Sequence, residues 1–433
     1  MRLLSLFAAI VLVASPAAAK LTSAEQAMVR TVDAEHGRTV SMLAKWVDQN
    51  SGTLNLPGVA ATGRMVGAEL ETLGFAFEWI DMKQAHRSGH LIARHKGNGR
   101  GKRLLLIGHL DTVFEPDSPF QRWERKGDWG HGPGAADDKG GVAVIVAALR
   151  AMQQAGTLRD ADITVFLTGD EEDAGDPIEI ARRDLIAAGK WADVALDFEG
   201  LVRDQGKDMG STARRSAGSW TVQVTATSAH SSGIFTPSSG YGAVYELARI
   251  LEAFRRELKE DKLTYNVGLI GGGTTAKLDE GRIRLEATGK TNIIPPAAVA
   301  RGDLRAIDAG QIERTRAKMR AIVARSLPGA HATISFDEDG YPPMPPTSGN
   351  RALLDKLNGV NRDSGLPVMP ELDPVKRGAG DISFVASDVD GLAGLGPASE
   401  GDHTPEEKVD IPSIPLQAKR AAILMSRLAA ESR

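Results

Sequence analysis

Helical stretches and short apolar runs alternate along the first two hundred residues of the chain. Apolar positions recur with helical spacing at about 23–50, 59–73, 142–152 and 178–189. Strand-like runs occupy 76–82, 90–95, 103–110, 163–169 and 193–199. The last three runs are continuously apolar, which is typical of parallel strands that are buried on both faces. We therefore expect an α/β fold with a mainly parallel sheet covered by helices.

The pattern changes after about residue 212. Segment 219–228 alternates apolar and polar side chains, as a half-exposed antiparallel strand does. Further elements are predicted as helices at 241–258 and 309–326 and as strands near 263–269, 282–287, 298–304 and 332–336. After a Pro-rich link at 339–349 the chain returns to the α/β pattern of the first two hundred residues. It ends in a helix at about 414–430. The sequence thus predicts an α/β domain in two parts, 20–213 and 339–433, interrupted by an inserted α+β domain at 214–338.

The N-terminal residues have the pattern of an export signal. Arg2 is followed by the apolar stretch Leu3 to Val13 and then by small residues that end in the A-x-A sequence before Lys20. The apolar stretch is shorter than the ~20 residues that span a bilayer. We expect cleavage after Ala19 and a periplasmic or secreted protein without a membrane association after processing. An uncleaved anchor is the alternative.

Composition narrows the chemistry. A chain of 433 residues with 42% hydrophobic residues is long enough for two domains, and its net charge of −4 gives no indication of nucleic-acid binding. Cysteine is absent, which excludes disulfides, a cysteine nucleophile and thiolate metal sites. Any metal must therefore be held by histidines and carboxylates.

Such side chains recur where the predicted strands end, and open parallel sheets bind ligands at the carboxyl ends of their strands. They are His109, Asp111, Asp137, Asp138, Glu171, Glu172, Asp197 and Glu199, with His403 near the C-terminus. Each motif alone has an ordinary explanation: a turn after a strand, a helix N-cap at Asp137 and Asp138, or a solvated charge cluster in 170-DEED-173. Together, oxygen and nitrogen ligands at several strand ends favour a site for zinc, manganese or cobalt. Two such metals about 3.5–4 Å apart require a shared carboxylate.

Five motifs occur in the order GHLDTV, GPGAADDKGG, TGDEED, DFEG and GDHTPEE. This order resembles the di-zinc metallopeptidases related to glutamate carboxypeptidase. That family also includes acetylornithine deacetylase, succinyl-diaminopimelate desuccinylase and aminoacylases. The resemblance covers nearly the whole mature chain and implies two Zn²⁺ ions, with Co²⁺ or Mn²⁺ as possible substitutes.

The resemblance also implies a role for each matching residue. The implied metal ligands are His109 and Glu199 on one zinc, Glu172 and His403 on the other, and Asp137 as the bridge. Asp137 is chosen over Asp138 because it starts the D-x-K-G pattern of the family. Glu171 would be the general base that deprotonates the shared water and then protonates the leaving nitrogen. Asp111 would orient His109.

The inserted domain resembles the lid and dimerisation domain of the family, so we expect a homodimer. His230 would reach the active site of a neighbouring subunit, although without the resemblance it is interpreted as a surface or strand-end histidine. Asn292 and Arg305 would engage a substrate carboxylate or carbonyl, with a structural salt bridge as the alternative for Arg305. Gly378 and Gly380 match a glycine-rich loop on the substrate side.

Three segments depart from the family pattern. The stretch after DEED is longer and more acidic, 240-GYGA-243 replaces a G-x-N-A signature, and 338-EDGYPP-343 lacks a basic residue expected in a glutamate-specific carboxypeptidase. The expected function is an exported dinuclear zinc hydrolase, carboxypeptidase-like, that cleaves an amide bond in a small peptide or an N-acyl amino acid. The alternatives are an aminoacylase or deacylase, and a catalytically silent binding protein on the same fold.

Overall fold

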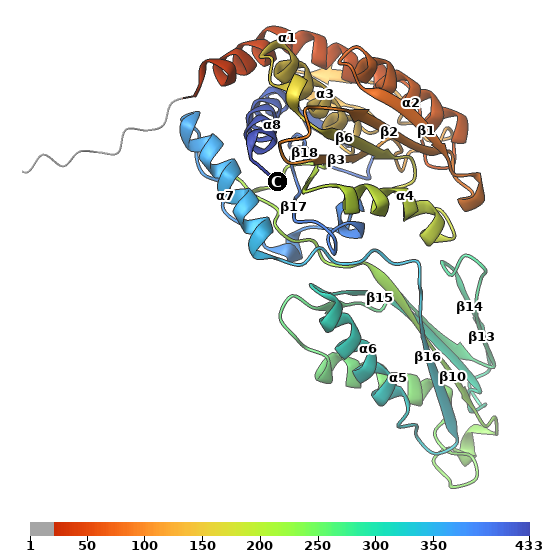
Figure 1. Cartoon of the computed structure of the whole chain (residues 1–433). Coiled ribbons are helices and arrows are strands. Elements are labelled where there is room, and N and C mark those ends of the chain that lie inside the picture. The colour runs from red at the N-terminus through yellow and green to blue at the C-terminus, as the bar shows by residue number, and fades with distance from the viewer. Residues whose placement is uncertain (1–20) are drawn as a thin grey trace, which may run out of the picture.

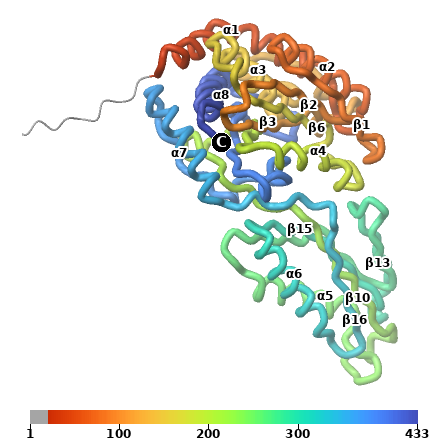
Figure 2. The backbone as a smooth tube through the Cα atoms, viewed as in Figure 1, coloured from red at the N-terminus to blue at the C-terminus, as the bar shows by residue number. Residues whose placement is uncertain are grey.

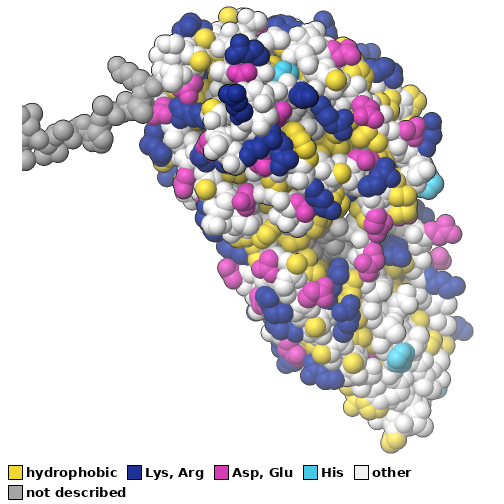
Figure 3. Space-filling view, viewed as in Figure 1, with side chains coloured by type: hydrophobic (Ala, Val, Ile, Leu, Met, Phe, Trp, Pro, Cys, Tyr) yellow, Lys and Arg dark blue, Asp and Glu magenta, His cyan; other side chains and the backbone are white. Residues whose placement is uncertain are grey.

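The computed structural model describes residues 21–433, so the expected export signal lies outside the described residues. The chain forms an α/β domain and a smaller inserted domain, which two segments of chain connect (Figures 1 and 2). Basic and acidic side chains are interspersed over the face drawn in Figure 3. Among the described residues, no helix is long and apolar enough to cross a membrane.

The α/β domain is built on a six-stranded sheet with the order β1-β2-β6-β3-β7-β17. Its strands are β1 (Ala76–Asp81), β2 (Gly89–His95), β3 (Leu104–His109), β6 (Ile163–Thr168), β7 (Val194–Asp197) and β17 (Gly391–Leu392). Strands β6, β3, β7 and β17 are mutually parallel, whereas β2 is antiparallel to both β1 and β6. The predicted α/β class with a mainly parallel sheet is confirmed.

Side chains from both faces of this sheet are buried, which explains the continuous apolar runs. Leu104 and Leu106 of β3 pack into one core, and Leu105 and Ile107 pack into another on the opposite face. The first face carries α1 (Ser23–Val47), α2 (Leu56–Glu71), α3 (Lys139–Gln154) and α8 (Ser413–Ala430), with α7 (Ser348–Asp363) beside them. The second face carries α4 (Ile178–Trp191) and the 3₁₀ turn Asp381–Phe384.

The inserted domain has a five-stranded antiparallel sheet covered on one side by two helices. The strands are β10 (Gly218–Ala226), β11 (Thr264–Tyr265), β12 (Leu269–Gly273), β15 (Ala297–Arg305) and β16 (Ala330–Phe336), and the helices are α5 (Gly242–Glu257) and α6 (Ala309–Val323). A hairpin of β13 (Thr275–Leu278) and β14 (Leu285–Thr288) extends beside this sheet (Figure 1). Trp220, fully buried against Phe254, is central to the core between sheet and helices.

Some predicted elements differ from the observed ones. The strand expected near 263–269 is divided into β11 and β12, and β13 and α7 were not predicted. Glycines at 268 and 271–273 remove the apolar alternation that marks a strand, which is why the pattern did not separate β12 from β11. The small elements β4 (Glu124–Lys126), β5 (Trp129–His131), β8 (Arg203–Asp204), β9 (Lys207–Asp208), β18 (Ser399–Glu400) and β19 (Lys408–Asp410) were also not predicted.

The central sheet leads to a test of the packing. Leu106 is fully buried, so Leu106→Ala removes transfer free energy and leaves a cavity. We expect a loss of about 2–5 kcal/mol in the free energy of unfolding, measured by denaturant titration. Leu54, which is 59% exposed, is the matched control, and Leu54→Ala is expected to change that free energy by less than about 0.5 kcal/mol. Equal losses in the two variants would contradict the packing described above.

Candidate active site

Three parallel strands bring the predicted site residues to one edge of the sheet. His109, the last residue of β3, lies in register with Thr168, which ends β6. Asp197 ends β7 and pairs with Ile107 of β3. The segments that follow β6 and β7, DEED and FEG, therefore start beside His109, as expected for the carboxyl ends of a parallel sheet.

The centre of the site is the carboxylate of Asp137, which lies between two imidazoles. Its Oδ1 is 3.0 Å from Nε2 of His109, and its Oδ2 is 3.0 Å from Nε2 of His403. Nε2 of His403 is also 3.2 Å from Oε2 of Glu172. One ligand atom each from His109, Asp137 and Glu172 lie within 4.8 Å of one another. These are nitrogen and oxygen donors of the kind that zinc, manganese and cobalt accept, so the residues fit a metal site.

Two further features distinguish the residues around Asp137. Asp138 is fully buried and its Oδ1 has no hydrogen-bond partner among the described residues, which is costly for a buried carboxylate. Asp138 occupies the N-cap position of α3, but its side chain does not cap the helix and instead accepts from the backbone N–H of His109. His403 has φ 63°, in the left-handed region, and such strain in a residue other than glycine is typical of functional positions.

The protonation of the site also shows that it attracts positive charge. Hydrogen bonds to Asp137 and Glu172 raise the pKa of His403 to about 11. Burial opposes protonation of His109, yet hydrogen bonds to Asp111 and Asp137 raise the pKa of its imidazole well above the usual value. Burial raises the pKa of Glu172 to about 7. The carboxylates thus either take up protons or favour protonated imidazoles beside them, as expected where negative charge exceeds positive charge.

Glu199 is the one predicted metal ligand that pairs with arginines. Its Oε2 lies 2.7 Å from Nη2 of Arg214 and 3.2 Å from Nη2 of Arg377. Both guanidinium groups are buried, and Arg214 also binds Asp197 at 3.0 Å. Glu199 is therefore paired with cations of the chain itself, and its role as a metal ligand stays a prediction.

Asp111 connects β3 to the DEED segment. Its Oδ1 lies 3.4 Å from Nδ1 of His109, and the backbone carbonyl of Asp111 lies 3.1 Å from the same nitrogen. Its carboxylate also accepts the backbone N–H groups of Glu171 and Glu172, at 3.0 and 3.1 Å, and the hydroxyl of Thr53 at 2.6 Å. Contacts of this kind fix the orientation of a metal-binding imidazole. The predicted orientation of His109 by Asp111 remains a proposal.

The four carboxylates of DEED have different surroundings. Asp170 is buried and accepts from Arg182 at 2.6 Å, whereas Asp173 is exposed and pairs with Arg87 at 2.6 Å. Glu172 faces His403. No hydrogen bond to the carboxylate of Glu171 is found within residues 21–433, and burial raises its pKa well above the usual value. A buried carboxylate with free oxygens beside a metal-ligand set is suited to proton transfer.

Sequence reasoning missed several residues that hold this site together. They are Arg182, Arg214, Tyr341, Arg377 and Glu407. Glu407 is 1% exposed, and its Oε1 accepts the backbone N–H groups of Ala136 and Asp137 at 3.0 and 3.2 Å. The motif GDHTPEE contains Glu407, so its position four residues after His403 was an available signal. Arg182 had no such signal, because an arginine on a helix is normally a surface residue.

The predicted substrate-side residues are divided between two places. Gly380 lies beside the site, where an added Cβ would come within 2.3 Å of the Arg214 guanidinium, and the carbonyl of Gly378 accepts from Arg214 at 2.9 Å. His230 and Asn292 lie together, because Ser231 N–H donates to the carbonyl of Asn292.

His230 and Asn292 lie beyond the distal end of β10. This strand starts at the connection to the α/β domain and has nine residues, which corresponds to roughly 27 Å. Within this chain, His230 and Asn292 are therefore remote from Asp137. Arg305 pairs with Asp303 at 3.0 Å, which is the salt bridge considered as the alternative for this residue.

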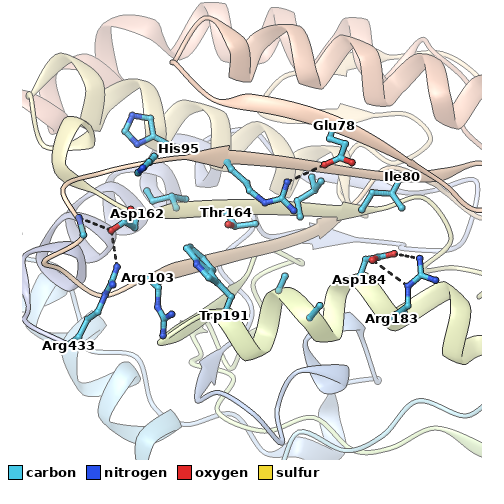
Figure 4. A pocket seen from close by; sticks show the side chains of 17 residues that line it. Glu78, Ile80, His95, Arg103, Asp162, Thr164, Arg183, Asp184, Trp191 and Arg433 are labelled. Atoms are coloured by element: carbon cyan, nitrogen blue, oxygen red, sulfur yellow. Dashed lines mark hydrogen bonds and ion pairs between the residues drawn. The ribbon is translucent and has the colours of Figure 1, made fainter.

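A separate hollow of about 870 Å³ lies at the opposite end of the sheet (Figure 4). It is lined by the amino ends of β6 and β3, the far end of β2, and α4. Most of its charged side chains already pair with one another, such as Arg94 with Glu78 and Arg433 with Asp162. This hollow contains none of the predicted site residues.

Known proteins with similar sequences and folds are peptidases and related hydrolases, which agrees with the metal-ligand geometry around Asp137. The sequence matches peptidase family M20/M25/M40 over residues 105–427. The chain belongs to this family. It is 30% identical to carboxypeptidase G2 of Pseudomonas sp. (strain RS-16) over 410 residues, which are 92% of this chain and 90% of that protein. It is 27% identical to succinyl-diaminopimelate desuccinylase of Acidiphilium cryptum (strain JF-5), over 83% of this chain and 91% of that protein.

Among solved structures, aminopeptidase PepT from Bacillus cereus has the same fold, with a TM-score of 0.71 and 18% identity over 91% of this chain and 99% of that chain. The resemblance stated from the motifs is thus confirmed. This member of the M20/M25/M40 family is a metallohydrolase with an α/β catalytic domain and an inserted lid.

The contacts of Glu407 generate a prediction about metal binding. Glu407→Ala removes the acceptor of two buried N–H groups, one of them on Asp137, and lets the Asp137 loop relax. We expect metal affinity to fall by about 10–100-fold, the usual effect of losing a contact that supports a ligand. Metal content after dialysis, measured by mass spectrometry, tests this. Glu406→Ala, a neighbouring exposed glutamate, is the control, and equal metal loss in both variants would refute the role of Glu407.

Proposed function

We propose that this metallohydrolase is an exported, dinuclear zinc carboxypeptidase-like enzyme that cleaves an amide bond in a small peptide or an N-acyl amino acid. The observation that carries the proposal is the carboxylate of Asp137, with one oxygen on His109 and the other on His403. A carboxylate with an imidazole at each oxygen is suited to bridge two cations. Co²⁺ and Mn²⁺ are possible substitutes for zinc.

Five residues would hold the metals. They are His109 and Glu199 on one side, Glu172 and His403 on the other, and Asp137 in common. When bound, the two cations polarise the scissile carbonyl and make a water molecule easier to deprotonate. Both Arg214 and Arg377 contact Oε2 of Glu199, so its Oε1 would be the oxygen offered to a metal while the two arginines keep hold of Oε2.

The residues of the chain supply proton transfer and orientation. Glu171 takes the proton of the attacking water and passes it to the leaving nitrogen, which is general base and general acid catalysis by one carboxylate. Its backbone is held by Asp111, so the carboxylate stays beside the scissile bond. Asp111 also fixes the ring of His109.

The substrate would be bound between the two domains. Arg305 would supply a guanidinium for a substrate carboxylate or carbonyl, and the loop of Gly378 and Gly380 would border the cleaved bond. Asn292 lies at the far end of the inserted domain with His230, so its amide would come from the other subunit. Because His230 and Asn292 are remote from Asp137 in one chain, we propose a homodimer in which His230 serves the site of the other subunit. The expected export signal supports a periplasmic or secreted location.

A deacylase of N-acyl amino acids is the second candidate, because the chain is also similar to succinyl-diaminopimelate desuccinylase. The same proton transfer at an amide bond serves both reactions. The carboxypeptidase-like activity is preferred because the sequence identity to carboxypeptidase G2, 30%, is higher than the 27% identity to the desuccinylase.

A substrate panel with metal analysis tests the proposal. The purified protein is expected to bind two equivalents of zinc and to hydrolyse one class among C-terminal-Glu peptides, other dipeptides and N-acyl amino acids. Removal of the metals by a chelator should abolish turnover, and zinc or cobalt should restore it. If the protein binds no metal and cleaves no substrate after metal is added, the enzyme proposal is refuted. The alternative of a catalytically silent binding protein would then remain.

The general base has its own test. Glu171→Gln is expected to keep both metals and to lower kcat by roughly 10²–10⁴-fold, because the amide cannot accept the proton of the water. The exposed Asp173 of the same segment offers the control Asp173→Asn, for which we expect nearly unchanged kcat. Loss of zinc in Glu171→Gln would instead identify Glu171 as a ligand.

A further inference from the structure

Tyr341 makes a contact to the proposed base that no part of the family resemblance assigns. It lies in 338-EDGYPP-343, one of the segments where the sequence departs from the family pattern. Its hydroxyl lies 2.7 Å from the backbone carbonyl of Glu171. The two residues are 170 positions apart in the sequence, so the fold alone creates this contact.

The direction of this hydrogen bond is fixed by Arg182. Nη2 of Arg182 lies 2.9 Å from the Tyr341 hydroxyl, and a guanidinium only donates. The hydroxyl oxygen accepts that bond, and its hydrogen is left for the carbonyl of Glu171. Arg182 in turn is held by Asp170 at 2.6 Å and by Asp381 at 2.9 Å. The carbonyl of Glu171 is therefore held by Tyr341, which is joined to a buried cluster of Arg182, Asp170 and Asp381.

The aromatic ring of Tyr341 has packing contacts of its own. It packs edge-on against Phe384 with centroids 4.9 Å apart, and the Arg182 guanidinium lies 5.7 Å from its centroid. These contacts do not use the hydroxyl. Tyr341→Phe therefore removes the hydrogen bond to Glu171 and the one from Arg182, while the packing around the ring remains.

Tyr341 also lies on the connection to the inserted domain. The segment that returns from β16 pairs with the outgoing segment, since Ala217 N–H donates to the Tyr341 carbonyl at 3.0 Å. Gly218, the next residue, starts β10. A displacement of the inserted domain thus acts on Tyr341 through backbone contacts, and Tyr341 acts on Glu171 through its hydroxyl.

We propose that Tyr341 is a positioning residue for Glu171 and that it links the position of the inserted domain to the general base. The inference rests on the proposed function of Glu171. It adds a contact between the segment that connects the two domains and the backbone of the base, and this contact does not touch the substrate.

The test is Tyr341→Phe in the full-length, metal-loaded enzyme. We expect kcat to fall about fivefold to tenfold, the size expected from the lost hydrogen bond to Glu171, because Arg182 keeps its contacts to Asp170 and Asp381. KM should change less than about twofold, because the effect lies on the transition state rather than on substrate binding. Metal content should stay the same. The control is Tyr265→Phe, which removes a hydroxyl that also donates to a backbone carbonyl, that of Arg255, within the inserted domain.

The outcomes separate the possibilities. An unchanged kcat in Tyr341→Phe, a rise in KM alone, or an equal fall of kcat in Tyr265→Phe would overturn the positioning role. Leu106→Ala supplies a destabilised enzyme that keeps the hydroxyl, and a comparable fall in its kcat well below its melting temperature would show a merely structural effect. If the unmodified enzyme with zinc cleaves no amide, the proposed function fails and this inference falls with it. An active enzyme with an unaffected Tyr341→Phe variant refutes the inference alone.

Discussion

The concentration of carboxylates at one edge of the central sheet is the constraint on which the rest of this structure depends. Parallel strands deliver acidic segments to the same edge, where burial makes each unpaired charge costly. The chain compensates from below with the buried cations Arg182, Arg214 and Arg377. Asp137 itself pairs with two histidines and with no arginine or lysine in the part of the chain that the structure describes. The carboxylates paired with arginines are already neutralised, whereas those around Asp137 keep an excess of negative charge. Such an excess is what a cation-binding site requires.

Contacts with these three arginines distinguish acidic residues that stabilise the site from acidic residues that are free to bind protons or metals. Asp170, Asp197 and Asp381 are tied to guanidinium groups and hold the floor of the site. Glu171 and Glu172 have no arginine partner among the described residues, so they are available for protons or metals. Glu199 belongs to both sets, since two arginines contact it although the motif makes it a ligand. Its pairing would hold the carboxylate in place before a metal binds.

The sequence predicted those features that depend on short stretches of neighbouring residues or on recognisable motifs. Continuous apolar strands, the order of five motifs and the position of His109 directly after its strand predicted the α/β class and the clustering of His109, Asp137, Glu172 and His403. It was uninformative where a contact joins distant segments. Arg182 and Tyr341 have side chains that are usually exposed, and only the fold shows that Arg182 is buried and that Tyr341 joins it to the backbone of Glu171. The splitting of the strand near 263–269 was missed because glycines there carry no alternation.

The arrangement of the connections explains how two domains can share one reaction. Both connecting segments carry a residue that contacts the acidic edge: Arg214 on the outgoing segment binds Glu199, and Tyr341 on the returning segment binds the backbone of Glu171. The same segments pair with each other through the backbones of Arg214 and Met344. A rotation of the inserted domain cannot occur without strain on these contacts. If the inserted domain encloses the substrate as proposed, its position and that of the proposed base would be coupled through these connections, without any requirement that the inserted domain touch Glu171 directly.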